Sequence, residues 1–231
     1  MGVAEVFPLP AEVVRAQIDQ VALDVDLAAV KTGMLATADI VRAVADEIGR
    51  LGIRNLVIDP VMASSRPRQV LGGPELDAGR TLLAPEAVSV LKTLLLPKAT
   101  VVTPNVAEAE ALCGIRVDSM DTAREAAKQI AGLGAAAVVI KGGHLHGPLA
   151  IDLLFHQEAF IELAAPRAAF AAVHGTGCTF ASAIAAGLAL GDDIPEAVQR
   201  AKRYVTGAIE QSFEIGGGAR LLNHFWAATR P

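Results

Sequence analysis

Apolar positions along this chain follow two spacings that alternate from one segment to the next. In the longer segments, apolar side chains recur three or four residues apart, which is typical of a helix with one buried face. Between these segments lie short, wholly apolar runs, which are typical of strands buried on both faces. The helical spacing predicts helices over residues 10–25, 37–51, 85–95, 121–133, 178–190 and 195–213, and the apolar runs predict strands at 28–31, 56–58, 101–102 and 137–140.

Residues that form caps and turns separate these elements. Thr37 and Asp121 stand where each can cap a helix. Two further strands, 152–156 and 159–163, are predicted with a tight turn at Gln157-Glu158 between them. Strands that alternate with helices at this spacing predict right-handed βαβ units. The sequence therefore indicates an α/β fold with a mostly parallel central sheet flanked by helices, in a single domain that spans the chain.

Composition narrows the range of partners. The chain has 231 residues, of which 52% are hydrophobic, and a formal net charge of −5. This charge gives no reason to expect nucleic acid or an anionic membrane surface as a partner, and no apolar run approaches the length that spans a membrane. Cys113 and Cys178 lie far apart without the spacing of a zinc site or a disulfide framework. A reducing cytoplasm is the simplest location.

Polar residues, glycine or proline follow four of the predicted strands. In an open parallel sheet, ligands bind outside the carboxyl ends of the strands, so these segments are candidates for a site. Such residues also end strands for local reasons, and one segment alone is weak evidence. The four segments are Thr32-Gly33-Met34, Asp59-Pro60-Val61-Met62, Thr103-Pro104-Asn105 and Lys141-Gly142-Gly143-His144.

The sharpest element is the stretch His174-Gly175-Thr176-Gly177-Cys178-Thr179, which leads into a predicted helix. Glycines let backbone N–H groups converge on an anion, and a helix N-terminus favours negative charge. Phosphoryl transfer needs such a site because charge builds on the transferred oxygens. The same position can lower the pKa of the Cys178 thiol. The alternative is an ordinary Gly-rich turn before a helix, with a small buried cysteine.

Three charged residues complete the candidate chemistry. Asp59 and Glu108 can hold Mg²⁺, directly or through water, because magnesium prefers oxygen ligands. Lys141 ends a strand where it can reach a nucleotide phosphate. Each has a plainer alternative: a turn or cap residue for Asp59, a first-turn helix residue for Glu108, and a solvated strand terminus for Lys141.

In this order, the pieces resemble the hydroxymethylpyrimidine/phosphomethylpyrimidine kinases of thiamine synthesis, a family of the ribokinase-like class. The most specific segment is 174–179, because many other members of that class carry Asp at the position of Cys178. The resemblance covers nearly the whole chain and includes the segments 30–35, 57–62, 103–109, 139–144, 174–179 and 223–225.

The resemblance implies a three-layer ribokinase-like fold and the roles of individual residues. Gly175, Thr176, Gly177 and Cys178 would form an anion hole, with Cys178 as the catalytic residue that activates the substrate hydroxyl. Cofactor contacts to ATP and Mg²⁺ would come from Asp59, Asn105, Glu108 and Lys141, and apolar contacts to the pyrimidine ring from Met34 and Val61. It also implies a homodimer or higher homo-oligomer that acts on a small-molecule pyrimidine.

One departure from the family concerns the start of the chain. The family begins with a strand and a Gly-rich loop, followed by a helix and a strand that bears a pyrimidine-contacting Gln, and nothing before Pro8 matches these. We therefore expect the sheet to lack N-terminal strands. Two other functions stay open: a pyridoxine-type kinase, whose substrate also carries a hydroxymethyl group on its ring, and a non-catalytic ligand-binding paralogue.

Overall fold

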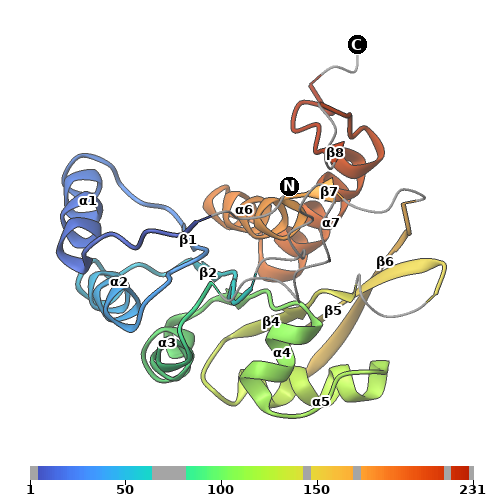
Figure 1. Ribbon diagram of the computed structural model, residues 1–231. Helices are drawn as coiled ribbons and strands as arrows, with labels where there is room; N and C mark the ends of the chain where they lie inside the picture. The colour runs from blue at the N-terminus through green and yellow to red at the C-terminus, as the bar shows by residue number, and fades with distance from the viewer. Residues whose placement is uncertain (1–4, 64–81, 143–146, 169–172, 216–219, 229–231) are drawn as a thin grey trace, which may run out of the picture.

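A computed structural model describes residues 5–63, 82–142, 147–168, 173–215 and 220–228. Its centre is a six-stranded sheet in which the strands follow one another in chain order, from β1 at one edge to β6 at the other (Figure 1). Strands β1 to β4 pair in parallel, and β5 and β6 add two antiparallel strands. The strands are β1 (Val30–Thr32), β2 (Leu56–Ile58), β3 (Val101–Val102), β4 (Ala137–Ile140), β5 (Leu149–His156) and β6 (Ala159–Pro166).

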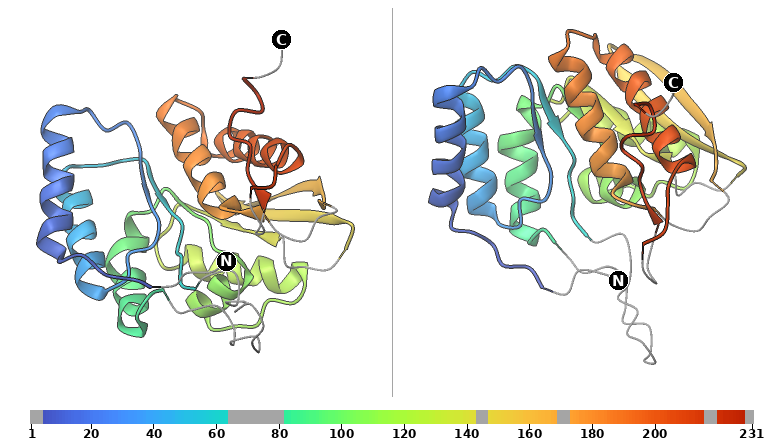
Figure 2. Two further views of the ribbon diagram at one scale, coloured as in Figure 1. Left: turned by 45° about the horizontal axis from the view of Figure 1, so that its top comes forward. Right: turned by 90° about the horizontal axis from the view of Figure 1, so that it is seen from above.

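Helices cover both faces of this sheet and make three layers, which confirms the predicted fold class (Figures 1 and 2). One face carries α2, α3, α4 and α5, and the other carries α6 and α7, which pack against each other. A separate two-stranded sheet joins β7 (Val173–His174) to β8 (Arg220–Leu221). The α-helices are α1 (Ala11–Asp24), α2 (Ala38–Arg50), α3 (Pro85–Val90), α4 (Val106–Cys113), α5 (Met120–Ala131), α6 (Thr176–Ala189) and α7 (Ile194–Glu210).

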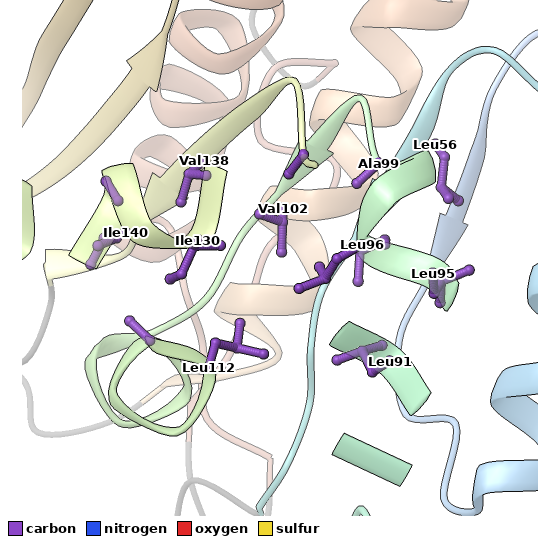
Figure 3. Close-up of a cluster of buried hydrophobic side chains, with 14 of the residues drawn as sticks. Leu56, Leu91, Leu95, Leu96, Ala99, Val102, Leu112, Ile130, Val138 and Ile140 are labelled. Carbon is purple, nitrogen blue, oxygen red and sulfur yellow. The ribbon is translucent and has the colours of Figure 1, made fainter. Parts of the chain in front are cut away.

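Alternating strand residues divide the core between the two faces. In β2, Leu56 and Ile58 join the cluster under α2 to α5, whereas Val57 joins the cluster under α6 and α7. Figure 3 shows the first cluster, in which Val102 lies between the leucines of the segment after α3 and a group formed by Ile130, Val138 and Ile140. Both faces of the parallel strands are therefore apolar, which is why their sequences read as continuous hydrophobic runs.

The predicted elements are present. Their boundaries differ from the predicted ones where helix capping or side-chain packing determines where an element begins or ends. Asp121 was predicted to cap α5, but Ser119 does so, in a reciprocal capping box with Thr122. The predicted helix 85–95 is α-helical only to Val90 and continues as a π-helical turn, Leu91–Leu95, and a 3₁₀ turn, Leu96–Lys98. Leu91, Leu95 and Leu96 are all buried there. The wider turn lets these side chains face the core together.

The two-residue turn between β5 and β6 was predicted correctly. Gln157 and Glu158 both have positive φ, 48° and 60°, and His156 pairs with Ala159 across the turn. Positive φ at both central residues is the geometry of a type I′ hairpin turn, whose twist matches that of the flanking strands. This hairpin extends the sheet well beyond β4.

Helix α1 lies outside the main layers and contributes no buried residue. It packs on α2, where Arg15 of α1 and Arg50 of α2 both bind Glu47, a carboxylate that is otherwise buried. Among the described residues, no helix is both long enough and apolar enough to cross a membrane.

Candidate active site

The residues singled out from the sequence meet at the carboxyl edge of the sheet. Asp59 follows β2, Asn105 and Glu108 follow β3, Lys141 follows β4, and Gly175 precedes α6. They line one cavity of about 560 Å³. The sequence-predicted residues that share this cavity are Asp59, Val61, Asn105, Glu108, Lys141, Gly175, Thr176, Gly177 and Cys178. Parallel strands place their carboxyl ends at one edge, and this brings distant segments together.

Four alternating charges follow one another at the floor of the cavity and just outside it. The ammonium nitrogen of Lys141 lies 2.8 Å from Asp59 Oδ1 and 3.8 Å from Glu108 Oε2. The other oxygen of Asp59, Oδ2, lies 3.9 Å from the ammonium of Lys31. Asp59 and Glu108 are buried, so their charges depend on these lysines for compensation. The solvated-terminus interpretation of Lys141 is therefore wrong, because its ammonium lies in the site between two carboxylates.

Local structure holds Glu108 in place. Asn105 and Glu108 form a capping box at the start of α4, in which each side chain accepts a hydrogen bond from the backbone N–H of the other. Burial raises the pKa of Glu108, and the nearby charge of Lys141 opposes this rise. The plainer interpretation of Glu108 as a first-turn helix residue is thus correct as far as it goes, but the same carboxylate also faces the cavity.

Helix α6 begins with the candidate anion site. Gly175 is its N-cap, with a left-handed φ of 84°, and Thr176, Gly177 and Cys178 form the first turn. Backbone N–H groups of a first helical turn have no acceptor within the helix, so these three are available to an anion. A Cβ atom added at Gly177 would lie 3.2 Å from Lys141 Nζ. Glycine therefore lets the backbone approach the lysine, so that N–H donors and a cation converge.

The electrostatics of Cys178 differ from the sequence-based expectation. The position at the start of α6 was expected to lower the pKa of its thiol. Instead the pKa is raised, first by partial desolvation of the sulfur and then by the negative charge of Asp59. The residue as a whole is exposed. Lys31 and Lys141 oppose the rise without cancelling it.

The arrangement bears on how magnesium can bind. In the described part of the chain, no group of three or more His, Cys, Asp or Glu side chains is placed to hold a metal ion. Asp59 and Glu108 do approach each other, but the ammonium of Lys141 lies between them. The two carboxylates therefore do not fit a directly chelated resident ion. Contact through water to a metal that arrives with nucleotide phosphates stays a prediction.

A buried ion pair in the cavity wall was missed by the sequence analysis. Lys202 of α7 donates hydrogen bonds to Asp152 Oδ2, at 2.8 Å, and to the carbonyl oxygen of Ala150, at 3.0 Å. The second oxygen of Asp152 accepts a hydrogen bond from the backbone N–H of Gly142, at 2.9 Å. The pair thus ties α7 and β5 to the residue that follows Lys141. The available signal was a charged residue among the buried positions Val198, Ala201 and Val205 of α7.

Two other predictions about the site have different outcomes. Met34 does not line the cavity and is 41% exposed, whereas Val61 lines it beside Asp59. Gly143 and His144 of the strand-end motif lie outside the described residues. The far wall of the cavity is largely apolar, with Ala165, Pro166, Val173, Val205 and Ile209 among its residues. The cavity therefore joins a charged floor to an apolar slot.

Comparison with known proteins decides the family. The model of the family described as "Phosphomethylpyrimidine kinase" matches residues 1–223. The chain belongs to this family. Its members are phosphotransferases, so the anion site and lysine described above lie in a kinase fold.

This member of the phosphomethylpyrimidine kinase family is similar to known relatives over most or nearly all of its length. It is 42% identical over 226 residues to the hydroxymethylpyrimidine/phosphomethylpyrimidine kinase of Bacillus subtilis, which covers 97% of this chain and 79% of that protein. An ADP complex of Bacillus subtilis pyridoxal kinase superposes with a TM-score of 0.85 at 35% identity, covering 98% of this chain and 80% of that one. A phosphomethylpyrimidine kinase from Clostridium difficile gives a TM-score of 0.71 at 34% identity, over 87% and 77% of the two chains.

Proposed function

We propose that this chain transfers the γ-phosphoryl group of Mg-ATP to the hydroxymethyl group of 4-amino-5-hydroxymethyl-2-methylpyrimidine, and then phosphorylates the resulting monophosphate. Both steps belong to thiamine biosynthesis. Family membership and the named activity of the Bacillus subtilis relative support the substrate. The ADP bound in the similar pyridoxal kinase supports ATP as the donor.

The observation that carries the proposal is the meeting of Gly175–Cys178 with Lys141 at the floor of the cavity. Backbone N–H groups and a fixed ammonium can together stabilise the charge that develops on the transferred phosphoryl group. The apolar slot beside Val205 and Ile209 suits a planar base, and the charged floor suits the phosphates. We assign this cavity to the nucleotide and call it the donor cavity.

Each reacting group has a place in the first phosphorylation. The hydroxyl oxygen of the pyrimidine forms a bond to the γ-phosphorus, and the bond from that phosphorus to the β,γ-bridging oxygen breaks, leaving its electrons on ADP. The hydroxyl proton passes to the Cys178 thiolate, which acts as general base. Lys141 and the N–H groups of α6 hold the transferred oxygens. Magnesium bound with ATP would neutralise phosphate charge.

A side-by-side turnover assay tests the function. Purified protein is given Mg-ATP with the hydroxymethylpyrimidine, its monophosphate or pyridoxal, and ADP release is followed. We expect turnover of both pyrimidines, with the larger kcat/KM for pyrimidine over pyridoxal. Turnover of pyridoxal alone would instead identify a pyridoxine-type kinase, the alternative that the higher TM-score to pyridoxal kinase favours. Thermal shift with Mg-ATP but no turnover of any acceptor would indicate a non-catalytic paralogue.

Assembly and location complete the proposal. Strand β1 forms one edge of the sheet, and Phe7, Leu23 and Phe225 are largely exposed. Unpaired edges and exposed apolar groups favour association, so we expect a homodimer or higher homo-oligomer. We expect the cytoplasm as its location, because the two cysteines suggest no disulfide framework. Light scattering that gives a monomeric mass across a wide range of concentrations would contradict the dimer.

A further inference from the structure

Of the two lysines beside Asp59, Lys31 is the one whose ammonium has no hydrogen bond within the part of the chain that the structure describes. Its side chain is only 19% exposed, and its closest charged partner is Asp59 Oδ2 at 3.9 Å. A lysine ammonium carries three N–H donors, and leaving them unpaired away from water is costly. The position therefore has unused capacity to bind an anion.

The backbone directs this side chain toward the reacting groups. In β1, Lys31 stands opposite Val57 of β2, and Val57 faces the layer formed by α6 and α7. A Cβ atom added at Gly33 would come within 2.9 Å of Lys31 Nζ, so glycine leaves room for the ammonium. The positive charge of Lys31 also acts on the thiol of Cys178, which begins α6.

Lys31 and Lys141 lie on opposite oxygens of Asp59. Lys141, on Oδ1, lines the donor cavity. Lys31, on Oδ2, does not line it, and Met34 follows in the same segment. One cation thus serves the nucleotide side, and the other lies on the side left for the acceptor.

The two proposed acceptors make different demands on that side. A hydroxyl acceptor is neutral and must lose a proton, so it needs a base. A monophosphate acceptor carries about −1.5 to −2 charges at neutral pH because its second pKa is about 6. Its attacking oxygen is already deprotonated, but it must approach Asp59 and the ATP phosphates against repulsion. It therefore needs a cation more than a base.

We propose that Lys31 forms an acceptor-side anion subsite that binds the phosphate of the monophosphorylated pyrimidine, so that the second phosphorylation depends mainly on Lys31 and the first mainly on Cys178. The inference rests on the proposed function. In the second step, a phosphate oxygen of the acceptor forms a bond to the γ-phosphorus, and the bond to the β,γ-bridging oxygen breaks with its electrons remaining on ADP. No proton has to move.

Two variants assayed against both acceptors test this division. Lys31→Met should lower kcat/KM for the monophosphate by about tenfold to a hundredfold, the effect of losing one hydrogen bond to a charged group. It should lower kcat/KM for the unphosphorylated hydroxymethylpyrimidine, here called the alcohol, only a few-fold. Cys178→Ala should do the reverse, lowering turnover of the alcohol about a hundredfold or more and of the monophosphate only a few-fold. Lys31→Arg should restore part of the second step.

Binding without turnover provides a second readout. By calorimetry in the absence of ATP, Lys31→Met should weaken binding of the monophosphate and leave binding of the alcohol within a few-fold of the wild type. The matched control is Lys98→Met, because Lys98 is exposed just before the amino end of β3, away from the site. It should change neither acceptor, and melting temperatures of all variants report whether they fold.

The outcomes separate the two proposals. If the wild type turns over both pyrimidines and Lys31→Met affects both steps equally, or neither, the subsite is overturned and the proposed function stands. If Lys31→Met weakens the alcohol as much as the monophosphate in the binding experiment, Lys31 is a general part of the site, and the subsite is again overturned. A wild type that neither binds nor phosphorylates either pyrimidine overturns the proposed function and the subsite together.

Discussion

The proposed nucleotide side and the proposed acceptor side of Asp59 differ in how fully their polar groups are paired. On the nucleotide side, Lys141 lies against Asp59 and Glu108, and Lys202 and Asp152 bind each other in the cavity wall. On the acceptor side, Lys31 has only a long contact to Asp59 and Met34 is substantially exposed. One half of the site is assembled before any ligand arrives, and in the proposal the other half is completed by its ligand.

This difference has a mechanistic meaning. Every reaction of the proposed enzyme uses the same donor, so fixed dipoles and charges on that side can be set once and need no reorganisation. The two acceptors differ in charge by the phosphate that the first step adds. A side with unpaired donors can bind either, at the cost of weaker organisation.

The largest expected effect concerns the assembled half. Asp152→Asn should lower the free energy of unfolding by about 3 kcal/mol, because Lys202 would lose its charged partner in a buried wall. Urea unfolding measures this. Asp118→Asn is the control, since it breaks an exposed pair with Arg116 that is worth at most about 1 kcal/mol. Equal losses of unfolding free energy in the two variants would mean that the buried pair stabilises the protein no more than an exposed pair does.

A second variant weakens the donor side directly. Lys141→Met should weaken binding of Mg-ATP by about tenfold or more, since it removes a charge-assisted contact and leaves two carboxylates facing the phosphates. Binding of the monophosphate acceptor should change less. Calorimetric titration of the protein with each ligand separately measures both binding affinities. A larger effect on the acceptor than on ATP would reverse the assignment of the two sides.

The dependence on pH should differ between the two steps. The raised pKa of Cys178 leaves little thiolate at neutral pH, so turnover of the alcohol should increase by about tenfold per pH unit until the pH reaches that pKa. The monophosphate, which needs no base, should show a flatter profile above pH 7. Lys31→Met should move the rise for the alcohol to higher pH, because loss of a positive charge raises the thiol pKa further. Parallel profiles for the two acceptors would contradict the division of roles.

The smallest expected effect tests the exposed part of the acceptor side. Met34→Ala should raise KM for both pyrimidines a few-fold and change the free energy of unfolding by no more than about 0.5 kcal/mol, as for other surface substitutions. Leu190→Ala, an exposed apolar residue at the end of α6, serves as the control and should leave KM unchanged. If Met34→Ala has no effect on KM, the predicted contact with the pyrimidine ring is absent.

Much of the fold was predictable because local patterns and tertiary packing agree. Strands β2, β3 and β4 are buried on both faces, and an apolar run is the direct result. The cap of α5 was less certain, because Ser119 and Asp121 are both able to accept the hydrogen bond and only the course of the backbone selects one. The π-helical turn after α3 follows from how its leucines pack, and no short-range signal marks it.

In the candidate site, too, the features that depend on tertiary packing could not be predicted from the sequence. Motif residues could be placed together because a parallel sheet brings its strand ends to one edge. Asp152 and Lys202 lie in separate elements, and only the approach of α7 to β5 pairs them. The pKa of Cys178 was predicted in the wrong direction, because the sequence shows the helix start but not the carboxylate of Asp59 beside the sulfur.

The turn at Gln157-Glu158 has a practical consequence. Asn-Gly adopts a type I′ turn with less conformational strain than a pair of longer side chains, so this corner of the hairpin is less stable than it could be. Natural proteins commonly retain such places because selection asks only for sufficient stability. Replacing Gln157-Glu158 with Asn-Gly should raise the stability of the protein without changing the donor cavity, since neither residue lines that cavity. Such a background would tolerate the destabilising variants above and keep them folded long enough to be assayed.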